Sequence, residues 1–315
     1  MNVNTNVLKL ALPDLVSNSY FPAIAAVELG MFKAEGLEVE LEMIYPAPAC
    51  YEALRDGRVQ LVAGSAHLPL GAFPDWRGVR LLCALSQGMY WFLVLRSDIA
   101  ANRGDLAVLD DRNIVAAPGV DLGFKALLAA ADIDPVAHGI NIGPLPGGVA
   151  PGVSFGVAAA RAMEAGHIDG FWANGMAAAV AVDSGAGQIV LDVRRGDGPA
   201  AAFAFTQPTL AARADFCELH PDIAQASVRA IMQTLRALRA DPSLATQVAS
   251  AWFPEQEARL IGGLVQLDSD FYTPELRDES LAAMQAFAVS FGNLSHPVDA
   301  DEFVDAGCRS LWTDG

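Results

Sequence analysis

Small polar and aromatic residues stand directly after apolar runs that are typical of buried strands. Ser19 and Tyr20 follow the run 7–12, and Ser65 and His67 follow the run 59–63. Such groups can hydrogen-bond a ligand, and hydroxyls in this position also cap the next helix. We expect Ser19 or Tyr20 to contact a ligand and Ser65 to offer a polar contact. For His67, a hydrogen-bonding or acid/base role and a structural role both stay open.

A second loop, 45–50, combines stiff prolines with small alanines that leave room for a ligand. Cys50 stands near the start of a predicted helix, where the pKa of a thiol tends to fall. A nucleophilic thiol also needs a partner base, and the nearest candidate is His67 on the neighbouring loop. We therefore predict Pro48 and Cys50 as ligand-contacting residues and predict that Cys50 is not a catalytic nucleophile.

The run 89–92 is unusually aromatic. Side chains alternate between the two faces of a strand, so Tyr90 and Phe92 are expected on one face and Trp91 on the other. The run could pack a hinge or form an aromatic wall for a ring-bearing or apolar ligand. We include Tyr90 among the candidate ligand residues.

Two further loops follow predicted strands in the second half of the chain. Gly119 and Asp121 precede a helix, and Asp121 suits an N-cap while the backbone around it could meet a ligand. Trp172 and Asn174 end another strand and open a helix. Core packing is the simpler role for Trp172. Ligands of open α/β sheets bind beyond such strand ends, so all four residues are candidates.

Composition narrows the possible partners. The 315 residues are 53% hydrophobic and carry a formal net charge of −17, which should repel nucleic acid and anionic membrane surfaces. No apolar run reaches membrane-spanning length, so no membrane insertion is expected. The cysteines match no metal-ligand spacing, and we predict neither a metal nor another cofactor. They are Cys50, Cys83, Cys217 and Cys308.

The beginning of the sequence shows no basic segment followed by an apolar stretch, as a secretion signal would. The sequence therefore predicts a periplasmic protein if a signal peptide has been removed, and a cytoplasmic one otherwise.

Strand and helix patterns alternate through the first 200 residues and restart after about residue 80. Such alternation predicts parallel sheets with helices on both faces. Beyond about residue 206 the pattern becomes mainly helical, with helices predicted over 221–240, 242–252 and 274–291. We predict two α/β lobes, residues 1–92 plus 204–315 and residues 93–203, with the helical tail packed on the first.

The stretch 19–73 resembles the family of periplasmic proteins that bind sulfonates, taurine, nitrate and thiamine-precursor pyrimidines. Its marks are "ELGMFKAEGLEVE" and "EALRDGRVQLVAGS", followed in order by "FLVLRSDIA", "AAPGVDLGFKALLAAADID", "ARAMEAGHIDGFWAN" and "LHPDIAQASVRAIMQTLRALRADP". The resemblance implies a type II periplasmic-binding-protein fold with hinge crossings near 90–93 and 201–205. It also implies that Trp172 and Asn174 lie in the cleft.

The resembling family also includes enzymes. Its sulfinate desulfinase uses a cysteine in the loop after the first strand, where this chain has 17–20 and no cysteine, and the cysteine-rich motif of its pyrimidine synthase is absent. We therefore expect a monomeric solute-binding protein for a small anionic or aromatic organic ligand, working with an ABC-type permease. The alternatives are a cytoplasmic enzyme on the same fold, such as a desulfinase- or decarboxylase-like lyase, and a soluble ligand sensor.

Overall fold

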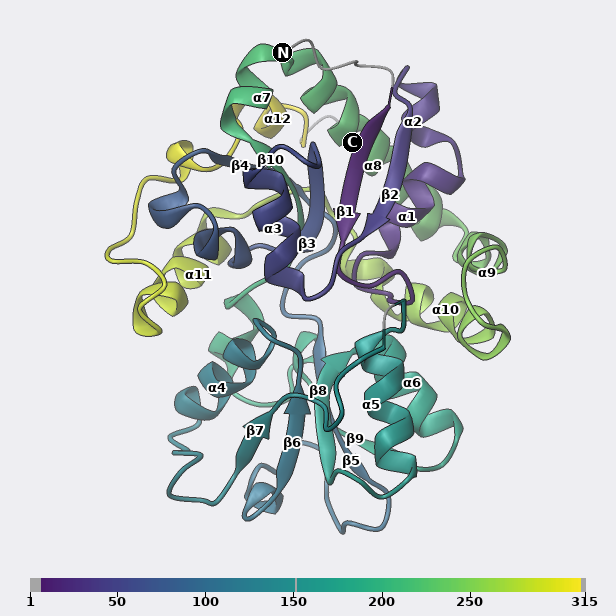
Figure 1. Ribbon diagram of the computed structural model, residues 1–315, viewed down its shortest axis with the longest axis vertical. Coiled ribbons are helices and arrows are strands. Elements are labelled where there is room, and N and C mark those ends of the chain that lie inside the picture. Colours follow the sequence, from purple (N-terminus) through teal and green to yellow (C-terminus); the bar gives the residue numbers. More distant parts are fainter. Residues whose placement is uncertain (1–6, 151, 313–315) are drawn as a thin grey trace.

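The computed structural model describes residues 7–150 and 152–312. Within these residues the chain forms two α/β lobes, one above the other in Figure 1, each built around a five-stranded sheet. The predicted two-lobed α/β architecture is confirmed. Residues 1–6 and 313–315 of the predicted first lobe lie outside the described part.

The first sheet has the strand order β2-β1-β3-β10-β4. Its inner strands are apolar runs that are buried on both faces, whereas β2 alternates at the edge. The strands are β1 (Leu8–Leu12), β2 (Val39–Met43), β3 (Leu61–Ser65), β4 (Val79–Ala84) and β10 (Pro208–Arg213). Strands β1, β2 and β3 run parallel to one another, and β10 runs antiparallel to β3 and β4.

The second sheet has the order β7-β6-β8-β5-β9. Its strands are β5 (Trp91–Arg96), β6 (Asn113–Ala116), β7 (Asn141–Gly143), β8 (Gly170–Asn174) and β9 (Gly187–Asp192). Here β6, β7 and β8 are parallel, while β5 runs antiparallel to β8 and β9.

Both sheets are therefore mixed: the parallel pairings predicted from the alternation are present, and β5 and β10 add antiparallel ones. The antiparallel strands are those that follow the connections between the lobes. Strand β5 is the first strand after the chain enters the second lobe, and β10 is the first after it returns. The two crossings are joined where the Met89 N–H donates to the Phe203 carbonyl at 2.8 Å. We propose that the lobes divide beside these crossings, as 1–92 with 204–315 and 93–203.

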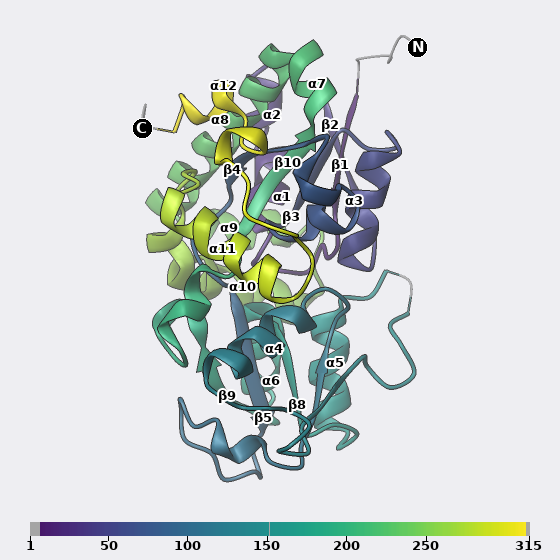
Figure 2. The same cartoon turned by 90° about the vertical axis from the view of Figure 1, so that its left-hand side faces the viewer.

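Helices cover both faces of each sheet. In the first lobe α3 and α8 lie on opposite sides of the sheet (Figure 2), and in the second α4 lies opposite α5 and α6 (Figure 1). The helices of these two regions are α1 (Phe21–Glu28), α2 (Met31–Ala34), α3 (Ala47–Arg55), α4 (Asp121–Ala130), α5 (Phe155–Glu164), α6 (Gly175–Asp183), α7 (Ala214–Leu219) and α8 (Pro221–Ala240).

The C-terminal region is helical from α7 onward, but it also touches the second lobe. Helix α8 packs against α1 and α2, whereas α10 packs against α6. The remaining helices are α9 (Ser243–Ala249), α10 (Glu255–Asp268), α11 (Asp278–Ser290) and α12 (Ala306–Arg309). The sequence patterns missed α10 and β10. None of the helices in the described residues is long and apolar enough to span a membrane.

Candidate ligand-binding site

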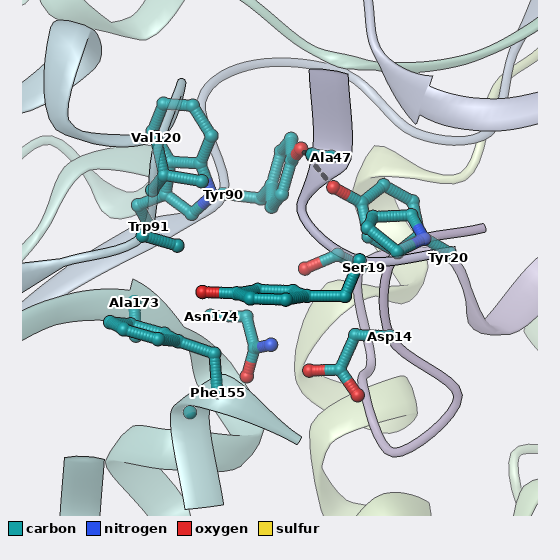
Figure 3. A pocket seen from close by; sticks show the side chains of 14 residues that line it. Asp14, Ser19, Tyr20, Ala47, Tyr90, Trp91, Val120, Phe155, Ala173 and Asn174 are labelled. Atoms are coloured by element: carbon teal, nitrogen blue, oxygen red, sulfur yellow. Dashed lines mark hydrogen bonds between the residues drawn. The ribbon is translucent and has the colours of Figure 1, made fainter. Parts of the chain in front are cut away.

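A cavity lies between the lobes, with about 460 Å³ of space including its open mouth. It stands at the carboxyl ends of strands of both sheets, where loops lead into helices, as expected for an α/β ligand site. Both lobes contribute to its wall (Figure 3). The lining residues are Pro13, Asp14, Ser19, Tyr20, Tyr45, Ala47, Tyr90, Trp91, Ala117, Val120, Phe155, Gly156, Ala173 and Asn174.

Asp14 places a carboxylate in this wall, in the loop between β1 and α1. The Ser154 hydroxyl of the second lobe donates to its Oδ2 at 2.6 Å, and the Val16 N–H donates to its Oδ1 at 2.9 Å. The residue is only 8% exposed, so the charged form has lost most of its contact with water. Asp14 thus joins the two lobes at the edge of the cavity.

Burial raises the pKa of Asp14 to about 7, although the hydrogen bonds from Ser154, Val16 and Asn174 lower it in part. Among the described residues, no lysine, arginine or histidine lines the cavity with it. The carboxyl group therefore changes its charge near neutral pH, in a place where a ligand could supply the missing counter-charge.

A chain of hydroxyl groups closes the first-lobe side of the cavity. The Tyr20 and Tyr90 hydroxyls lie 3.0 Å apart, and the Ser65 Oγ lies 2.6 Å from the Tyr90 hydroxyl. Burial raises the pKa of Tyr20 well above its ordinary value and that of Tyr90 to about 12, so both phenols stay neutral. The chain holds the two rings nearly perpendicular, with 6.0 Å between their centroids.

Aromatic side chains form much of the wall, and they come from separate segments. Tyr20 and Tyr45 belong to the first lobe, Tyr90 and Trp91 to the first crossing, and Phe155 to the start of α5. The strand β5 begins only at Trp91, so the alternation expected for 90–92 does not extend to Tyr90, and both Tyr90 and Trp91 reach the cavity. The prediction that Trp91 lies on the opposite face from Tyr90 was wrong for this reason.

Close contacts hold the lobes together beside the cavity. The Met176 N–H donates to the Asn18 Oδ1 at 3.1 Å, and the Asn18 amide donates to Asp268 at 2.8 Å. Gly175 permits this approach, because a Cβ atom there would lie 2.9 Å from the Asn18 Nδ2. At Gly119, where φ is +86°, a Cβ would lie 2.8 Å from the Leu68 Cδ2 of the other lobe.

Four of the residues predicted from the sequence lie in the cavity wall: Ser19, Tyr20, Tyr90 and Asn174. Ser19 is 2% exposed, and its Oγ has no hydrogen-bond partner among the described residues. The Asn174 Oδ1 accepts from the Ala177 N–H at 3.1 Å and thereby caps α6. Direct ligand contact by these four stays a prediction.

The other predicted residues stand behind the wall. His67 is buried between Thr206, 2.9 Å from its Nδ1, and the Gly119 carbonyl, 3.3 Å from its Nε2, and burial lowers its pKa to about 4. The Asp121 carboxylate accepts from the Gly119 N–H and pairs with Lys125. It lies within the first turn of α4, one residue beyond the N-cap, Val120.

Pro48, Cys50 and Trp172 also lie outside the lining. The Cys50 thiol donates to the Ile44 carbonyl at 3.1 Å, and burial raises its pKa to about 12, the opposite of what an activated nucleophile needs. Trp172 stacks on Phe124 with 5.0 Å between ring centroids and meets the Trp91 ring edge-on at 6.1 Å. Trp172 therefore supports the wall from behind.

The described residues hold no cluster of His, Cys, Asp and Glu side chains suited to a metal ion. The described lining also contains no cysteine or histidine that could act as a nucleophile or base. The polar groups that face the cavity are a carboxyl, an amide and hydroxyls. This set can bind and orient a small organic molecule.

Sequence reasoning missed Asp14, Tyr45 and Phe155. Asp14 looked like an ordinary turn residue after a proline, and only the opposite lobe buries it. Nothing in the sequence pattern indicates that Phe155 lines the same cavity as residues such as Tyr45, which lies 110 positions earlier in the chain. The strand-end rule could have suggested Asp14, because it follows β1 by two residues.

The chain matches no family model and no curated protein, but it is similar to solved structures over nearly its whole length. A periplasmic sulfonate-binding protein from Methylobacillus flagellatus KT is 17% identical, with a TM-score of 0.68, covering 98% of this chain and 94% of that one. The periplasmic nitrate-binding protein from Synechocystis PCC 6803 is 15% identical, with a TM-score of 0.73 and coverage of 99% and 88%.

The desulfurization enzyme DSZB is likewise similar, at 16% identity, with a TM-score of 0.63 and coverage of 96% and 98%. The TM-scores and the coverage establish the fold, which is the two-lobed type II periplasmic-binding-protein fold expected from the sequence. At identities this low, the similarity establishes the fold alone. Binding proteins and an enzyme share this fold, so function has to be argued from the site.

Proposed function

We propose that this protein is a solute-binding protein that closes its two lobes around a small organic molecule. The observation that carries the proposal is the cavity between the lobes, to which residues from both lobes contribute. A ligand held there contacts both lobes at once and so favours their closed arrangement by its difference in affinity. The aromatic wall favours a ligand with a flat or apolar part.

Features around the cavity support a closing movement. Hydrogen bonds join the lobes beside the cavity, as between Asp14 and Ser154, and again where Arg259 of α10 pairs with Asp183 of α6. Backbone crossings at 85–90 and 193–207 are the connections that a hinge would use, and such hinges are often short segments between elements.

The role that fits best is the binding component of an ABC-type importer. Similar structures include ligand-binding and sulfonate-binding components of such systems. In this role the protein is a monomer, meets a permease after closing on its ligand, and works in the periplasm once a leader has been removed. Without a leader it would work in the cytoplasm as a ligand sensor.

One observation favours a second candidate, an enzyme on the same fold. A carboxyl group with a pKa of about 7 in a cavity is poised for general acid or base catalysis. Asp14 would then be the acid or base. The desulfurization enzyme shows that the fold can carry catalysis.

A thermal-shift screen over sulfonates, carboxylates, nitrate, pyrimidines and amines would identify ligands, since a molecule that binds only the folded state raises the melting temperature. Small-angle scattering then measures closure. We expect a hit to reduce the radius of gyration and to be recovered chemically unchanged after long incubation. Conversion of the hit to product favours the enzyme, and the absence of closure with every hit contradicts the proposed function.

A further inference from the structure

Among the described residues of the cavity wall, the charged side chain is a carboxylate. Asp14 is the one acid of the lining within the described residues, and no basic side chain stands there with it. The Arg194 guanidinium lies outside the lining, with its Cζ 5.8 Å from the centroid of the Tyr90 ring. It is neutralised by Asp268, whose Oδ2 is 3.1 Å from the Arg194 Nη1. An anionic ligand would meet a carboxylate here without an opposing positive charge.

Several N–H groups at the helix N-termini around the cavity, which otherwise attract anions, donate to side chains of the protein or are replaced by proline. Pro22 and Pro48 stand in the first turns of α1 and α3 and have no N–H group. In α6 the first-turn N–H groups of Met176 and Ala177 donate to Asn18 and Asn174. In α5 the Ser154 hydroxyl accepts from Val157. These occupied or missing N–H groups reduce the number of donors that the helix N-termini offer to an anion.

The aromatic wall suits the opposite charge. Faces of phenol, indole and benzene rings attract cations, and the attraction grows when the site excludes water. Tyr20, Tyr90, Trp91 and Phe155 line the same cavity as Asp14 (Figure 3). Tyr45 belongs to the lining as well. The combination of several rings with one carboxylate is how proteins recognise ammonium groups.

Ser19 provides an independent sign of a ligand. Its side chain is 98% buried, lines the cavity, and has an Oγ without a hydrogen-bond partner among the described residues. Buried hydroxyls are nearly always paired, so an unpaired one that lines a cavity indicates a missing partner. A ligand N–H or hydroxyl group in the cavity would supply that partner.

We propose that the cavity binds an organic ammonium ion with a flat or apolar body, its positive nitrogen held between Asp14 and the aromatic rings. This inference rests on the proposed solute-binding function and names its ligand class. It departs from the anionic ligands after which the similar sulfonate-binding and nitrate-binding proteins are named.

The test compares probes that carry the same phenylethyl group and differ in the charge of the group attached to it. These are 2-phenylethylammonium, 2-phenylethanol and 3-phenylpropionate, with benzyltrimethylammonium as a cation that cannot donate a hydrogen bond. Calorimetry and thermal shift at pH 8 measure binding to the full chain. We expect both cations to bind at least about tenfold more tightly than the alcohol, and the carboxylate to bind most weakly.

Asp14→Asn is the decisive variant because the amide keeps the shape and an acceptor for Ser154. We expect it to fold and to weaken cation binding at least about tenfold, with little change for the alcohol. Asp222→Asn, an exposed change in the first turn of α8, is the matched control and should bind like the native chain. Melting curves confirm that both variants are folded.

The outcomes separate this inference from the function on which it rests. Tighter binding of the carboxylate than of the cations, undiminished cation binding by Asp14→Asn, or no cation binding at millimolar concentration would each overturn the ammonium site. If an anion binds and closes the lobes, the solute-binding function stands and only the ligand class is wrong. If molecules of every charge fail to close the lobes, the proposed function fails as well.

Discussion

Two buried aspartates, Asp14 at the cavity and Asp268 at the end of α10, differ in what accompanies them. Asp268 lies between Arg194, at 3.1 Å, and Arg195, at 2.7 Å, and also accepts from the Asn18 amide. Asp14 has only neutral donors around it, from Ser154 and the Val16 N–H. Both residues are less than 10% exposed.

The difference teaches how a protein treats a buried charge that it does not neutralise itself. A buried carboxylate is tolerated when cations and hydrogen bonds replace the lost water. At Asp268 the chain supplies both, and the group ties α10 to the hinge region. At Asp14 the cation is missing, and the pKa rises to about 7. The charge of Asp268 is balanced within the chain, whereas we propose that a ligand balances the charge of Asp14.

The largest effect is expected from Asp268→Asn, which removes the negative charge between Arg194 and Arg195. Leaving buried charges without a counter-ion should destabilise the fold by about 3–5 kcal/mol. Denaturant unfolding at pH 7 measures the free energy of unfolding. A decrease in the free energy of unfolding below about 1 kcal/mol would show that Asp192 and water replace Asp268. The contrast between Asp268 and Asp14 would then not hold.

Asp14→Asn should change the free energy of unfolding in the opposite direction and stabilise the unliganded protein at alkaline pH. The folded-state pKa is raised from 3.8 to about 7, so the native carboxyl contributes most favourably below pH 4, and that stability is lost as pH rises through 7. By pH 8 the contribution of Asp14 to the free energy of unfolding has fallen by up to about 4 kcal/mol. The variant should therefore exceed the native chain in stability above pH 7 and match it near pH 4.

The groups that face Asp14 do not titrate in this window. The nearest is Tyr45, whose pKa is raised by burial and then by Asp14, and the pKa values of Tyr20 and Tyr90 are raised as well. The difference in unfolding free energy between the native chain and Asp14→Asn, measured from pH 4 to pH 9, therefore reports on Asp14, because the contribution of buried His67 is common to both. A stability difference that stays constant over this range would contradict the assignment.

Gly175→Ala should weaken ligand binding about tenfold or more while changing stability little. The new methyl group would lie 2.9 Å from the Asn18 Nδ2 of the other lobe, so it obstructs the closed arrangement more than either lobe alone. Small-angle scattering should show a larger radius of gyration with ligand than the native chain has. Gly263→Ala, in α10 with open space around its Cβ position, is the control. Equal closure by both variants would exclude the proposed contact.

Phe155→Leu should reduce the affinity for an ammonium ligand by about 1 kcal/mol and leave that for a neutral analogue nearly unchanged. Leucine keeps an apolar surface but lacks the ring face that attracts a cation. Calorimetry with 2-phenylethylammonium and 2-phenylethanol separates the two effects. Equal losses for both probes would reduce Phe155 to a simple packing residue.

Cys50→Ser should have the smallest effect on ligand binding, because the thiol lies outside the cavity lining and faces the Ile44 carbonyl. Treatment of the native protein with a thiol-alkylating reagent should likewise leave binding unchanged. If the native protein converts a sulfinate or aromatic carboxylate, and Cys50→Ser abolishes that conversion, the enzyme interpretation replaces the binding one.

The sequence predicted those parts of the fold that depend on local pattern. Most strands and helices up to β9 carry their periodicity within a short window. The strand-end rule led to Ser19, Tyr20 and Asn174, and the aromatic run 89–92 led to Tyr90. Strand β10 was missed because its pairing partners, β3 and β4, lie more than 120 residues earlier in the chain. Its short apolar run could not be distinguished from the start of a helical region.

The charge character of the site was beyond sequence reasoning for a similar reason. Asp14 gains its importance from burial, and burial comes from Ser154 and other residues of the opposite lobe. The Met176 N–H at the start of α6 is likewise occupied by Asn18, which lies 158 positions earlier in the chain. Pattern analysis led to several residues that line the cavity, and only the assembled lobes gave the charge of its wall.

Proton release on binding of benzyltrimethylammonium tests the central claim most directly, because this probe has no proton of its own to exchange. A cation beside Asp14 lowers the pKa of about 7, so calorimetry at pH 7 in buffers of different ionisation enthalpy should show about half a proton released per ligand. The release should vanish at pH 9 and in Asp14→Asn. Proton uptake, or binding without any proton exchange at pH 7, would contradict the account.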